Sequence, residues 1–237
     1  MGSLSHSLNR TALITGGSSG IGKSLVKKLS QEKITTGFVD IVSPESVLDN
    51  SFFFEHDISK PDQVQKLYEN LVNKIGLPDI IICNAGRGIQ ETLKDGDPEK
   101  WIRIFEINVF GALRIIRAFL PQMLEKERGD IVFISSVSSK HPYPGGAIYA
   151  ATKASIDVIA ETLRLEVQPD IRVTTISPGV VNTDFFKNIV HGSQTPESIG
   201  WGYLEPEDIA DAIFYAINKP HNVAMNNIII RPVAQPM

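Results

Sequence analysis

The sequence contains very little cysteine. Cys83 is the single cysteine among 237 residues, so no disulfide bond can form within the chain. It ends the apolar run 79–83, which is typical of a buried strand, and a thiol in such a place is more often a small hydrophobic group than a reactive one. A chain without disulfides suits a reducing compartment, and we therefore expect a cytoplasmic protein.

The sequence also lacks an excess of positive charge and long apolar stretches. Its 23 lysines and arginines are scattered along the chain against 27 aspartates and glutamates, which gives a net charge of -4. This balance argues against a nucleic-acid partner. No apolar run approaches the roughly 18 residues that span a membrane. We therefore expect a small-molecule ligand, with neither nucleic acid nor a membrane as partner, and we assign no metal ligands.

What the sequence does contain is an alternation of strand and helix patterns. Apolar runs typical of strands lie at 13–14, 34–39, 52–56, 79–83, 131–134, 171–176 and 228–230. Helical spacing lies at 25–29, at 59–75 with Ser59 as N-cap, at 98–121 with a bend at Pro121, at 147–165 and at 208–219. This order predicts an α/β protein with a doubly wound parallel sheet of about seven strands and helices on both faces. We expect one domain, 11–237, after a disordered polar leader, 1–10.

The first strand runs into a glycine-rich turn, Gly16-Gly17-Ser18-Ser19-Gly20-Ile21-Gly22, and then into an amphipathic helix. Glycine permits positive φ and lets the backbone approach a ligand closely, and a helix N-terminus offers unpaired N–H groups with a positive dipole end. The turn is therefore either a pyrophosphate cradle or a glycine-rich βα turn without a ligand.

Asp40 follows the second strand, 24 positions after Gly16. In dinucleotide-binding units an acidic residue about 20 residues beyond the glycines accepts hydrogen bonds from the adenosine ribose. The alternative is an ordinary aspartate in the turn that ends a strand. Neither Ser19 nor Ile41 is basic, so no neighbour would offset a 2′-phosphate. The pattern predicts NAD, with NADP as the less favoured cofactor.

Other polar residues stand at strand ends or in helices that could border them. Asn84-Ala85-Gly86 closes the fourth strand with small residues, against which a ligand could lie. Asn108 lies inside a helical pattern, where an asparagine is either solvated or hydrogen-bonded. Tyr149 and Lys153 are four residues apart and share one helix face, either as a functional pair or as a surface pair.

Taken in order, these motifs resemble the short-chain dehydrogenase/reductase (SDR) family over residues 11–230. The matching pieces are TGGSSGIG at 15–22, NAG at 84–86, Asn108, Ser136, YAATK at 149–153 and PGVVNT at 178–183. The resemblance implies a Rossmann fold, an NAD(P)-dependent oxidoreductase and a homodimer or homotetramer. Cys83 departs from the family pattern, because a second asparagine usually precedes NAG. The replacement of this asparagine by Cys83 puts in doubt a structural bridge of the family, but it does not affect the hydride and proton transfer that the resemblance implies.

The resemblance also assigns roles residue by residue. It implies a catalytic tetrad of Asn108, Ser136, Tyr149 and Lys153. Asp57 would lie by the adenine, Asn84 would line the adenosine side, and Thr183 would meet the nicotinamide carboxamide. The implied cofactor-binding residues are Gly16, Ser18, Ser19, Gly20, Ile21, Gly22, Asp40, Asp57, Ile58, Asn84, Ala85, Gly86, Tyr149, Lys153, Pro178, Gly179, Val181 and Thr183.

Tyr149 would carry the proton of the substrate hydroxyl. Tyrosine is a poor acid or base near pH 7 because its free pKa is about 10. The Lys153 ammonium and the positive nicotinamide ring should lower that pKa, so that Tyr149 takes the proton in oxidation and returns it in reduction. By resemblance, Ser136 would hydrogen-bond the substrate oxygen, and Asn108 would support a water that leads protons to Lys153.

The substrate is the least determined feature. The tail NIIIRPVAQ is similar to that of a branch that includes dehydrogenases of small 3-hydroxy acids, and Arg87 either binds a substrate carboxylate or is an exposed loop arginine. Three functions stay open: oxidation of a secondary alcohol such as a small 3-hydroxy acid, reduction of a 3-oxoacyl thioester or another carbonyl, and non-catalytic dinucleotide sensing. We expect 185–203, with Gly192, to form a mobile lid in which His191 is solvated.

Overall fold

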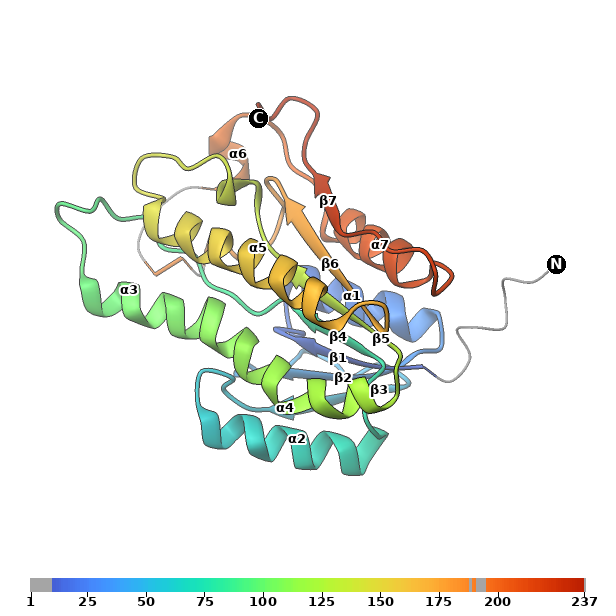
Figure 1. Ribbon diagram of the computed structural model, residues 1–237. Coiled ribbons are helices and arrows are strands. Elements are labelled where there is room, and N and C mark those ends of the chain that lie inside the picture. Colours follow the sequence, from blue (N-terminus) through green and yellow to red (C-terminus); the bar gives the residue numbers. More distant parts are fainter. Residues whose placement is uncertain (1–9, 188, 191–194, 237) are drawn as a thin grey trace.

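The computed structural model describes residues 10–187, 189–190 and 195–236, which build one parallel sheet flanked by helices (Figure 1). Its strands are β1 (Thr11–Thr15), β2 (Thr35–Asp40), β3 (Ser51–Glu55), β4 (Ile80–Cys83), β5 (Gly129–Ile134), β6 (Ile171–Pro178) and β7 (Asn227–Ile230). They lie in the order β3-β2-β1-β4-β5-β6-β7. The order reverses between β1 and β4, and in open α/β sheets a ligand crevice opens at such a point. The predicted fold class is confirmed.

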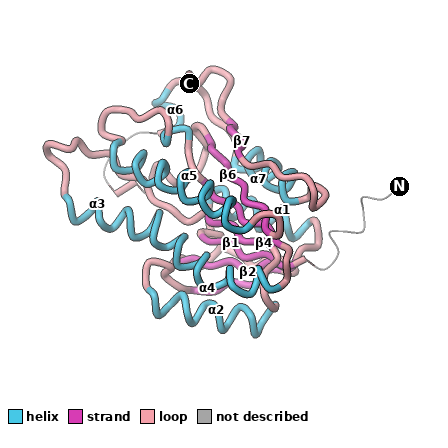
Figure 2. Tube along the Cα trace, viewed as in Figure 1, coloured by secondary structure: helices cyan, strands magenta, loops and turns pink. Residues whose placement is uncertain are grey.

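Helices cover both faces of this sheet (Figure 2). They are α1 (Gly20–Gln31), α2 (Pro61–Ile75), α3 (Pro98–Phe105), α4 (Gly111–Glu125), α5 (Ala147–Val167), α6 (Pro196–Ile199) and α7 (Pro206–Ile217), with a π-helical turn, η1 (Glu106–Phe110), and a 3-10 turn, η2 (Val137–Ser139). Successive residues of a strand point to opposite faces. Leu13 accordingly packs in the core under α2, α4 and α5, whereas Ile14 packs in the core under α1 and α7.

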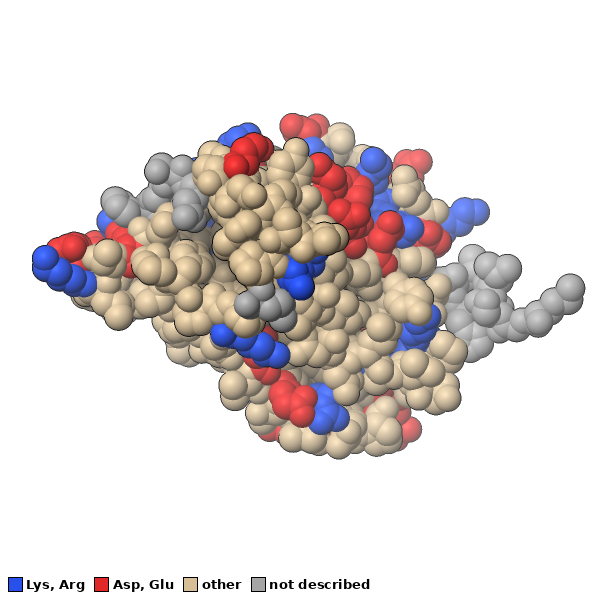
Figure 3. Space-filling model, turned by 90° about the horizontal axis from the view of Figure 1, so that it is seen from above, with Lys and Arg blue, Asp and Glu red and all other residues tan. Residues whose placement is uncertain are grey.

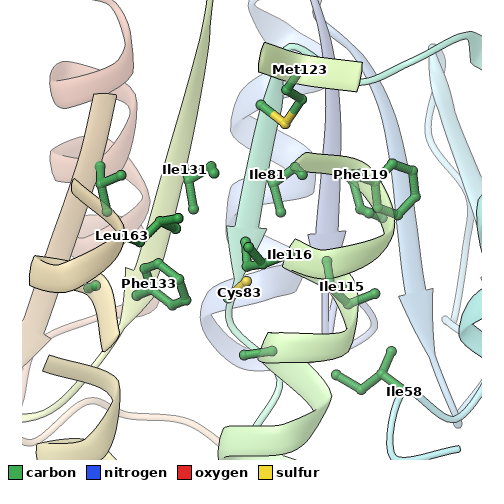
Figure 4. Packing of buried hydrophobic residues seen from close by; sticks show 14 of the residues in the cluster. Ile58, Ile81, Cys83, Ile115, Ile116, Phe119, Met123, Ile131, Phe133 and Leu163 are labelled. Atoms are coloured by element: carbon green, nitrogen blue, oxygen red, sulfur yellow. The ribbon is translucent and has the colours of Figure 1, made fainter. Parts of the chain in front are cut away.

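The core under α4 and α5 holds the single cysteine (Figure 4). Ile115, Ile116 and Phe119 of α4 pack in one cluster with Ile81 and Cys83 of β4. Burial raises the pKa of the Cys83 thiol to about 12. The thiol is therefore protonated near neutral pH and packs as a small hydrophobic group, as the sequence predicts.

Helix α2 begins one residue later than predicted. Its N-cap is Lys60, which makes no side-chain capping bond, and Pro61 occupies the first turn. The prediction of Ser59 as the cap was wrong. The helical hydrogen bonds begin at the carbonyl oxygen of Lys60, which accepts the N–H of Val64. Ser59 belongs to the preceding turn, where its backbone N–H donates to Oδ1 of Asp57 at 2.9 Å. The turn that ends β3 thus extends as far as Lys60, whose N–H donates to the carbonyl oxygen of Asp57.

The helical pattern at 98–121 is not one uninterrupted α-helix. It divides into α3, the π turn η1 and α4, and α4 continues past Pro121 to Glu125. A π turn inserts an extra residue into a helix and often occurs at functional sites. Asn108 lies within η1. The continuous apolar spacing concealed this local change, because a π turn leaves the residues on both sides helical.

Arg10 is bound at the amino-terminal edge of the sheet, and its assignment to a disordered leader was wrong. Its guanidinium pairs with Asp130 and donates to the carbonyl oxygen of Ile217 at 2.8 Å. The leader prediction rested on local polarity, whereas the partner of Arg10 comes from β5, 120 residues away in sequence. The rest of the predicted leader, 1–9, lies outside the described residues.

The surface carries charges of both signs. On the face seen in Figure 3, lysines and arginines lie near aspartates and glutamates and do not gather into one broad positive patch. Within the described ranges, no helix combines the length and the apolar character needed to cross a membrane.

Candidate functional site

A cavity of about 730 Å³ lies beyond the carboxyl ends of the strands. Its walls come from the turn after β1, from the ends of β2, β4, β5 and β6, and from α5. The predicted residues that line it are Gly16, Ser18, Ser19, Gly20, Ile21, Asp40, Asp57, Ile58, Asn84, Ala85, Gly86, Arg87, Ser136, Tyr149, Lys153, Pro178, Gly179, Val181 and Thr183. Gly22 and Asn108 are the two predicted residues outside this lining. One cavity therefore gathers motifs from the whole length of the chain.

The glycine turn fits a pyrophosphate. Gly16 and Gly20 have φ values of 69° and 51°, a conformation that favours glycine, and a Cβ at Gly22 would lie 2.0 Å from the carbonyl oxygen of Gly16. Ser19 makes no capping bond to α1, which leaves the first N–H groups of the helix available. Among the described residues, the buried hydroxyl of Ser18 has no hydrogen-bond partner. Unused donors at a positive helix end suit an anion.

Asn84 ties the end of β4 to this turn. Its Nδ2 donates to the carbonyl oxygens of Thr15 and Gly16, at 2.9 and 3.0 Å. The hydroxyl of Thr15 in turn accepts the backbone N–H groups of Asn84 and Ala85, both at 3.0 Å. The family resemblance implies that Asn84 faces the adenosine, and the residue does line the cavity. Its amide N–H groups, however, are used to shape the turn.

Asp40 stands at the end of β2 beside the same turn. Its Oδ2 accepts the N–H of Ser18 at 3.1 Å, and its Oδ1 accepts those of Ile41 at 2.8 Å and Val42 at 3.3 Å. The carboxylate is thus held against the glycine turn and does not point freely into solvent. Oδ1 thus uses both of its lone pairs, and Oδ2 keeps one for a further donor.

Asn108 is hydrogen-bonded and is 2% exposed. Its Oδ1 accepts the N–H of Arg87 at 2.8 Å, and its Nδ2 donates to the carbonyl oxygen of Arg87 at 2.9 Å and to the hydroxyl of Thr152 at 3.1 Å. The π turn therefore presents an amide that joins the loop after β4 to α5. Of the two alternatives for this residue, the structure shows the hydrogen-bonded one.

Lys153 is buried beneath the cavity, with 5% exposure. Its Nζ donates to the carbonyl oxygen of Ile134, at 2.7 Å, and lies 5.8 Å from the ring centre of Tyr149. Burial lowers the pKa of Lys153 to about 8, and the negative charge of Asp157 opposes this shift. An ammonium has three N–H donors, and the described residues provide one acceptor, so two donors can serve a ligand.

Tyr149 lies above Lys153 and beside Ser136. Loss of hydration raises the pKa of the Tyr149 phenol above its usual value, and a hydrogen bond with Ser136 acts in the opposite direction. The sequence predicts a lowered pKa through Lys153 and a nicotinamide ring, but in this structure burial has the larger effect. Ser136 Oγ also accepts the N–H of Ser138 at 3.1 Å, which fixes its position. Phenol, hydroxyl and ammonium thus border the same part of the cavity.

An aromatic segment covers this group. The ring of Phe185 lies 5.5 Å from that of Tyr149 and 5.8 Å from that of Phe186. A Cβ at Gly88 would lie 2.8 Å from Phe185, and the N–H of Val190 donates to the carbonyl oxygen of Gly88 at 3.0 Å. Phe185 and Val190, which belong to the predicted lid, thus contact the loop after β4. His191 and Gly192 lie outside the described residues.

Several lining residues were not predicted as site residues, although those from Phe185 onward, Gln235 apart, belong to the predicted lid, 185–203. They are mostly apolar or aromatic and include Val137, Tyr143, Phe185, Phe186, Ile189, Ile199 and Trp201, together with Gln235 from the tail. The pair Phe185-Phe186, two residues after Thr183, was the available signal. Gln235 gave no sequence signal, because a single polar residue near the end of a chain forms no periodic pattern.

Comparisons with known proteins agree with this geometry. A family model described as short chain dehydrogenase matches residues 10–194. An uncharacterized oxidoreductase of Staphylococcus saprophyticus is 34% identical over 239 residues and covers 96% of this chain and 97% of its own. A 3-ketoacyl-(acyl-carrier-protein) reductase of Brucella melitensis complexed with NADH has a TM-score of 0.86 at 26% identity, over 95% of this chain and 98% of that one. A closed form of serine dehydrogenase complexed with NADP+ has a TM-score of 0.85 at 26% identity, over 96% of each chain.

Proposed function

Because the chain belongs to the short-chain dehydrogenase family, we propose that it is an NAD-dependent oxidoreductase that interconverts a secondary alcohol and its ketone, with Tyr149 as acid and base. One observation supports this most directly: the Lys153 Nζ lies 5.8 Å from the Tyr149 ring and has donors to spare beneath the cavity. Two such residues one helical turn apart would be unremarkable on a surface. Here both border the same cavity.

The cofactor would extend from the glycine turn to the loop after β6. The first N–H groups of α1 would bind the pyrophosphate, with Asp57 and Ile58 near the adenine and Thr183 near the carboxamide. When bound, the nicotinamide accepts or supplies the hydride. Lys153 would donate to its ribose with one of the N–H groups that Ile134 does not use.

Proton transfer would be the work of the chain itself. Ser136 holds the substrate oxygen near Tyr149, whose phenol takes the proton in oxidation and gives it back in reduction. The Lys153 ammonium favours the phenolate by its charge. Asn108 contributes by fixing the backbone of Arg87 and the hydroxyl of Thr152, through which the wall of the site is held in place.

Asp40 is the basis for proposing NAD over NADP. Its carboxylate is held at the glycine turn, where Oδ2 can accept a hydrogen bond from a ribose hydroxyl. A 2′-phosphate would bring like charges together. Both neighbours that could carry a compensating charge, Ser19 and Ile41, are neutral. Since the structural relatives include complexes with NADH and with NADP+, this preference rests on the residues of this chain.

For the substrate we propose a secondary alcohol such as a small 3-hydroxy acid, whose carboxylate Arg87 would bind. The serine dehydrogenase relative acts on a substrate of comparable size, which supports this choice. The 3-ketoacyl reductase relative and the apolar lining around Phe185 support the alternative, a 3-oxoacyl thioester or another carbonyl. A non-catalytic sensor is disfavoured because all four tetrad residues are present. We further propose a cytoplasmic homodimer or homotetramer.

The test is a screen for NADH oxidation with ketones and oxo acids, and for NAD reduction with the matching alcohols. Turnover in either direction supports the proposal, and binding of NADH without any turnover favours the sensor. Within the screen, Arg87→Ala should raise KM for acidic substrates about tenfold, the effect of one lost charged hydrogen bond, and leave neutral ones unchanged. Equal effects on both classes would exclude a carboxylate role.

A further inference from the structure

The chain after β7 folds back onto the wall of the cavity. Gln235 is 6% exposed although it stands two positions before the end of the sequence. Its N–H donates to the carbonyl oxygen of Pro232 at 3.0 Å, and the guanidinium of Arg231 donates to the carbonyl oxygen of Gln235. This turn places the side chain of Gln235, together with Pro236, in the cavity lining.

The amide of Gln235 reaches the loop that follows β6, residues 178–183. Its Oε1 accepts the backbone N–H of Val180 at 3.0 Å, across 55 positions of sequence. Val180 is buried, with 6% exposure. A buried N–H without an acceptor is destabilising, and Gln235 is the acceptor that the described residues provide for this one.

The loop 178–183 and the chain after β7 are in close contact at Gly179. A Cβ at this position would lie 2.1 Å from Oε1 of Gln235 and 2.8 Å from Cβ of Arg231. The N–H of Gly179 donates to the carbonyl oxygen of Ile230 at 2.7 Å. A larger residue at 179 would therefore displace the glutamine amide, whether or not a ligand is bound.

The other side of the loop is held by Leu204. The N–H of Leu204 donates to the carbonyl oxygen of Val180 at 2.9 Å, and the N–H of Asn182 donates to that of Leu204 at 2.8 Å. The loop ends at Thr183, whose Cγ2 would lie 3.2 Å from a Cβ placed on Gly20 of the glycine turn. The loop thus lies between the tail and Leu204, and it reaches the start of α1.

From these contacts we infer that Gln235 is a positioning residue for the nicotinamide end of the cofactor, acting through Val180 and Gly179. The inference rests on the proposed function, because it requires a nicotinamide cofactor in the cavity. Gln235 transfers neither hydride nor proton. It fixes the loop whose residues Pro178, Gly179, Val181 and Thr183 form that end of the cavity.

The experiment compares two ligands that differ only at the nicotinamide end. The dissociation constants of NADH and of ADP-ribose, which lacks the nicotinamide, are measured by calorimetry for the wild type and for Gln235→Ala. We expect Gln235→Ala to weaken NADH about tenfold, the effect of one buried donor left unpaired, and to leave ADP-ribose unchanged. Gln235→Glu, which keeps an acceptor at the same place, should restore most of the NADH affinity.

Two further variants serve as the matched control and the independent test. Val233→Ala alters the same tail at a fully exposed side chain and should change neither affinity. Gly179→Ala breaks the same hydrogen bond from the loop side, so it should reproduce the selective loss, and adding Gln235→Ala to it should bring little further loss.

The outcomes separate this inference from the proposed function. Equal weakening of NADH and ADP-ribose, unchanged NADH affinity, or no recovery in Gln235→Glu would overturn the inference while the wild type still binds NADH. Unfolding of both Gln235→Ala and Gly179→Ala would also overturn it, since the contact would then be purely structural. A wild type that binds ADP-ribose but not NADH would overturn the proposed function as well.

Discussion

At the amino-terminal edge of the sheet, Asp130 lies between Arg10 and Arg172, and every charged group there has several partners. Arg172 donates to Asp130 at 2.7 Å and to the carbonyl oxygens of four residues, Ile217, Lys219, Pro220 and Val223. At the carboxyl edge, Lys153 is buried to a similar extent but is given one acceptor, Ile134. The polar groups at the amino-terminal edge use their hydrogen bonds to hold the fold. Those at the carboxyl edge keep part of their hydrogen-bonding capacity for a ligand.

Burial also shifts the pKa values of the groups at the carboxyl edge. Burial lowers the pKa of Lys153 and raises that of Tyr149, so each charged form is disfavoured. Nearby, Asp157 has one buried oxygen without a partner among the described residues. Titratable groups whose charged form is disfavoured in the folded chain and stabilised on ligand binding are typical of functional sites. The same sheet therefore has a stabilising edge and a reactive edge.

The largest expected effect tests the reactive edge. Tyr149→Phe removes the oxygen that transfers the proton and little volume, so kcat should fall about 100- to 10,000-fold. The NADH dissociation constant and the midpoint of thermal unfolding should stay at their wild-type values. Steady-state kinetics measures kcat, calorimetric titration measures the NADH dissociation constant, and thermal denaturation measures the unfolding midpoint. Turnover near the wild-type rate would remove Tyr149 from the mechanism.

The next effect tests the stabilising edge. Asp130→Ala leaves the buried guanidinium of Arg172 without its counter-ion, which should lower the free energy of unfolding by about 3–5 kcal/mol. Urea denaturation measures this, with Asp95→Ala as control. Asp95 pairs with Lys94 on the exposed surface, where such a pair contributes about 0–1 kcal/mol. Similar losses in both variants would mean that the ion cluster does not stabilise the fold.

A third prediction concerns selectivity at the reactive edge. Asp40→Ala combined with Ile41→Arg replaces a carboxylate by a cation next to the adenosine end, so the preference for NAD should fall by about 10- to 100-fold or reverse. The ratio of kcat/KM values for the two cofactors measures it. An unmutated protein that uses NADPH as well as NADH would already show that Asp40 lacks this role.

The smallest expected effect is the change of stability with pH that Lys153 causes, and it is compared with the effect of Arg172 at the other edge. The pKa of Lys153 is about 8 in the folded chain and about 10.5 in the unfolded chain, so the unfolded state binds more protons between these values. This group therefore destabilises the fold most below pH 8, and its penalty disappears as the pH rises toward 10.5. Lys153→Met should then be about 1 kcal/mol more stable than the wild type near pH 7, with a smaller gain at pH 9.

The matched variant is Arg172→Met at the other edge. It removes a cation whose contacts all lie within the fold, so stability should fall at both pH values. Urea denaturation at pH 7 and pH 9 gives both results. A loss of stability in Lys153→Met at pH 7 would contradict the view that this lysine is retained at the expense of stability.

The sequence was sufficient for features that depend on local pattern. Alternating strands and helices predicted the sheet, and the residues of the motifs proved to border one cavity, with Gly22 and Asn108 behind its wall. Features set by distant contacts were missed. Arg10 was assigned to a leader because its partner Asp130 is 120 positions away, and Gln235 was overlooked because Val180 is 55 positions away. Side-chain contacts between residues so far apart in sequence produce no periodic pattern in the sequence.

The contacts of Arg172 also bear on how the chain folds. The last carbonyl groups of a helix have no partners within it, and here a side chain of β6 serves those at and beyond the end of α7. Until β6 is in place, the carbonyl oxygens of Lys219, Pro220 and Val223 lack this donor, and that of Ile217 has Arg10 alone. Strand and helix should therefore open and close as one cooperative unit, with matching hydrogen-exchange protection. The carboxyl end of α7 is thus held by side chains that lie 45 and 207 positions earlier in the sequence.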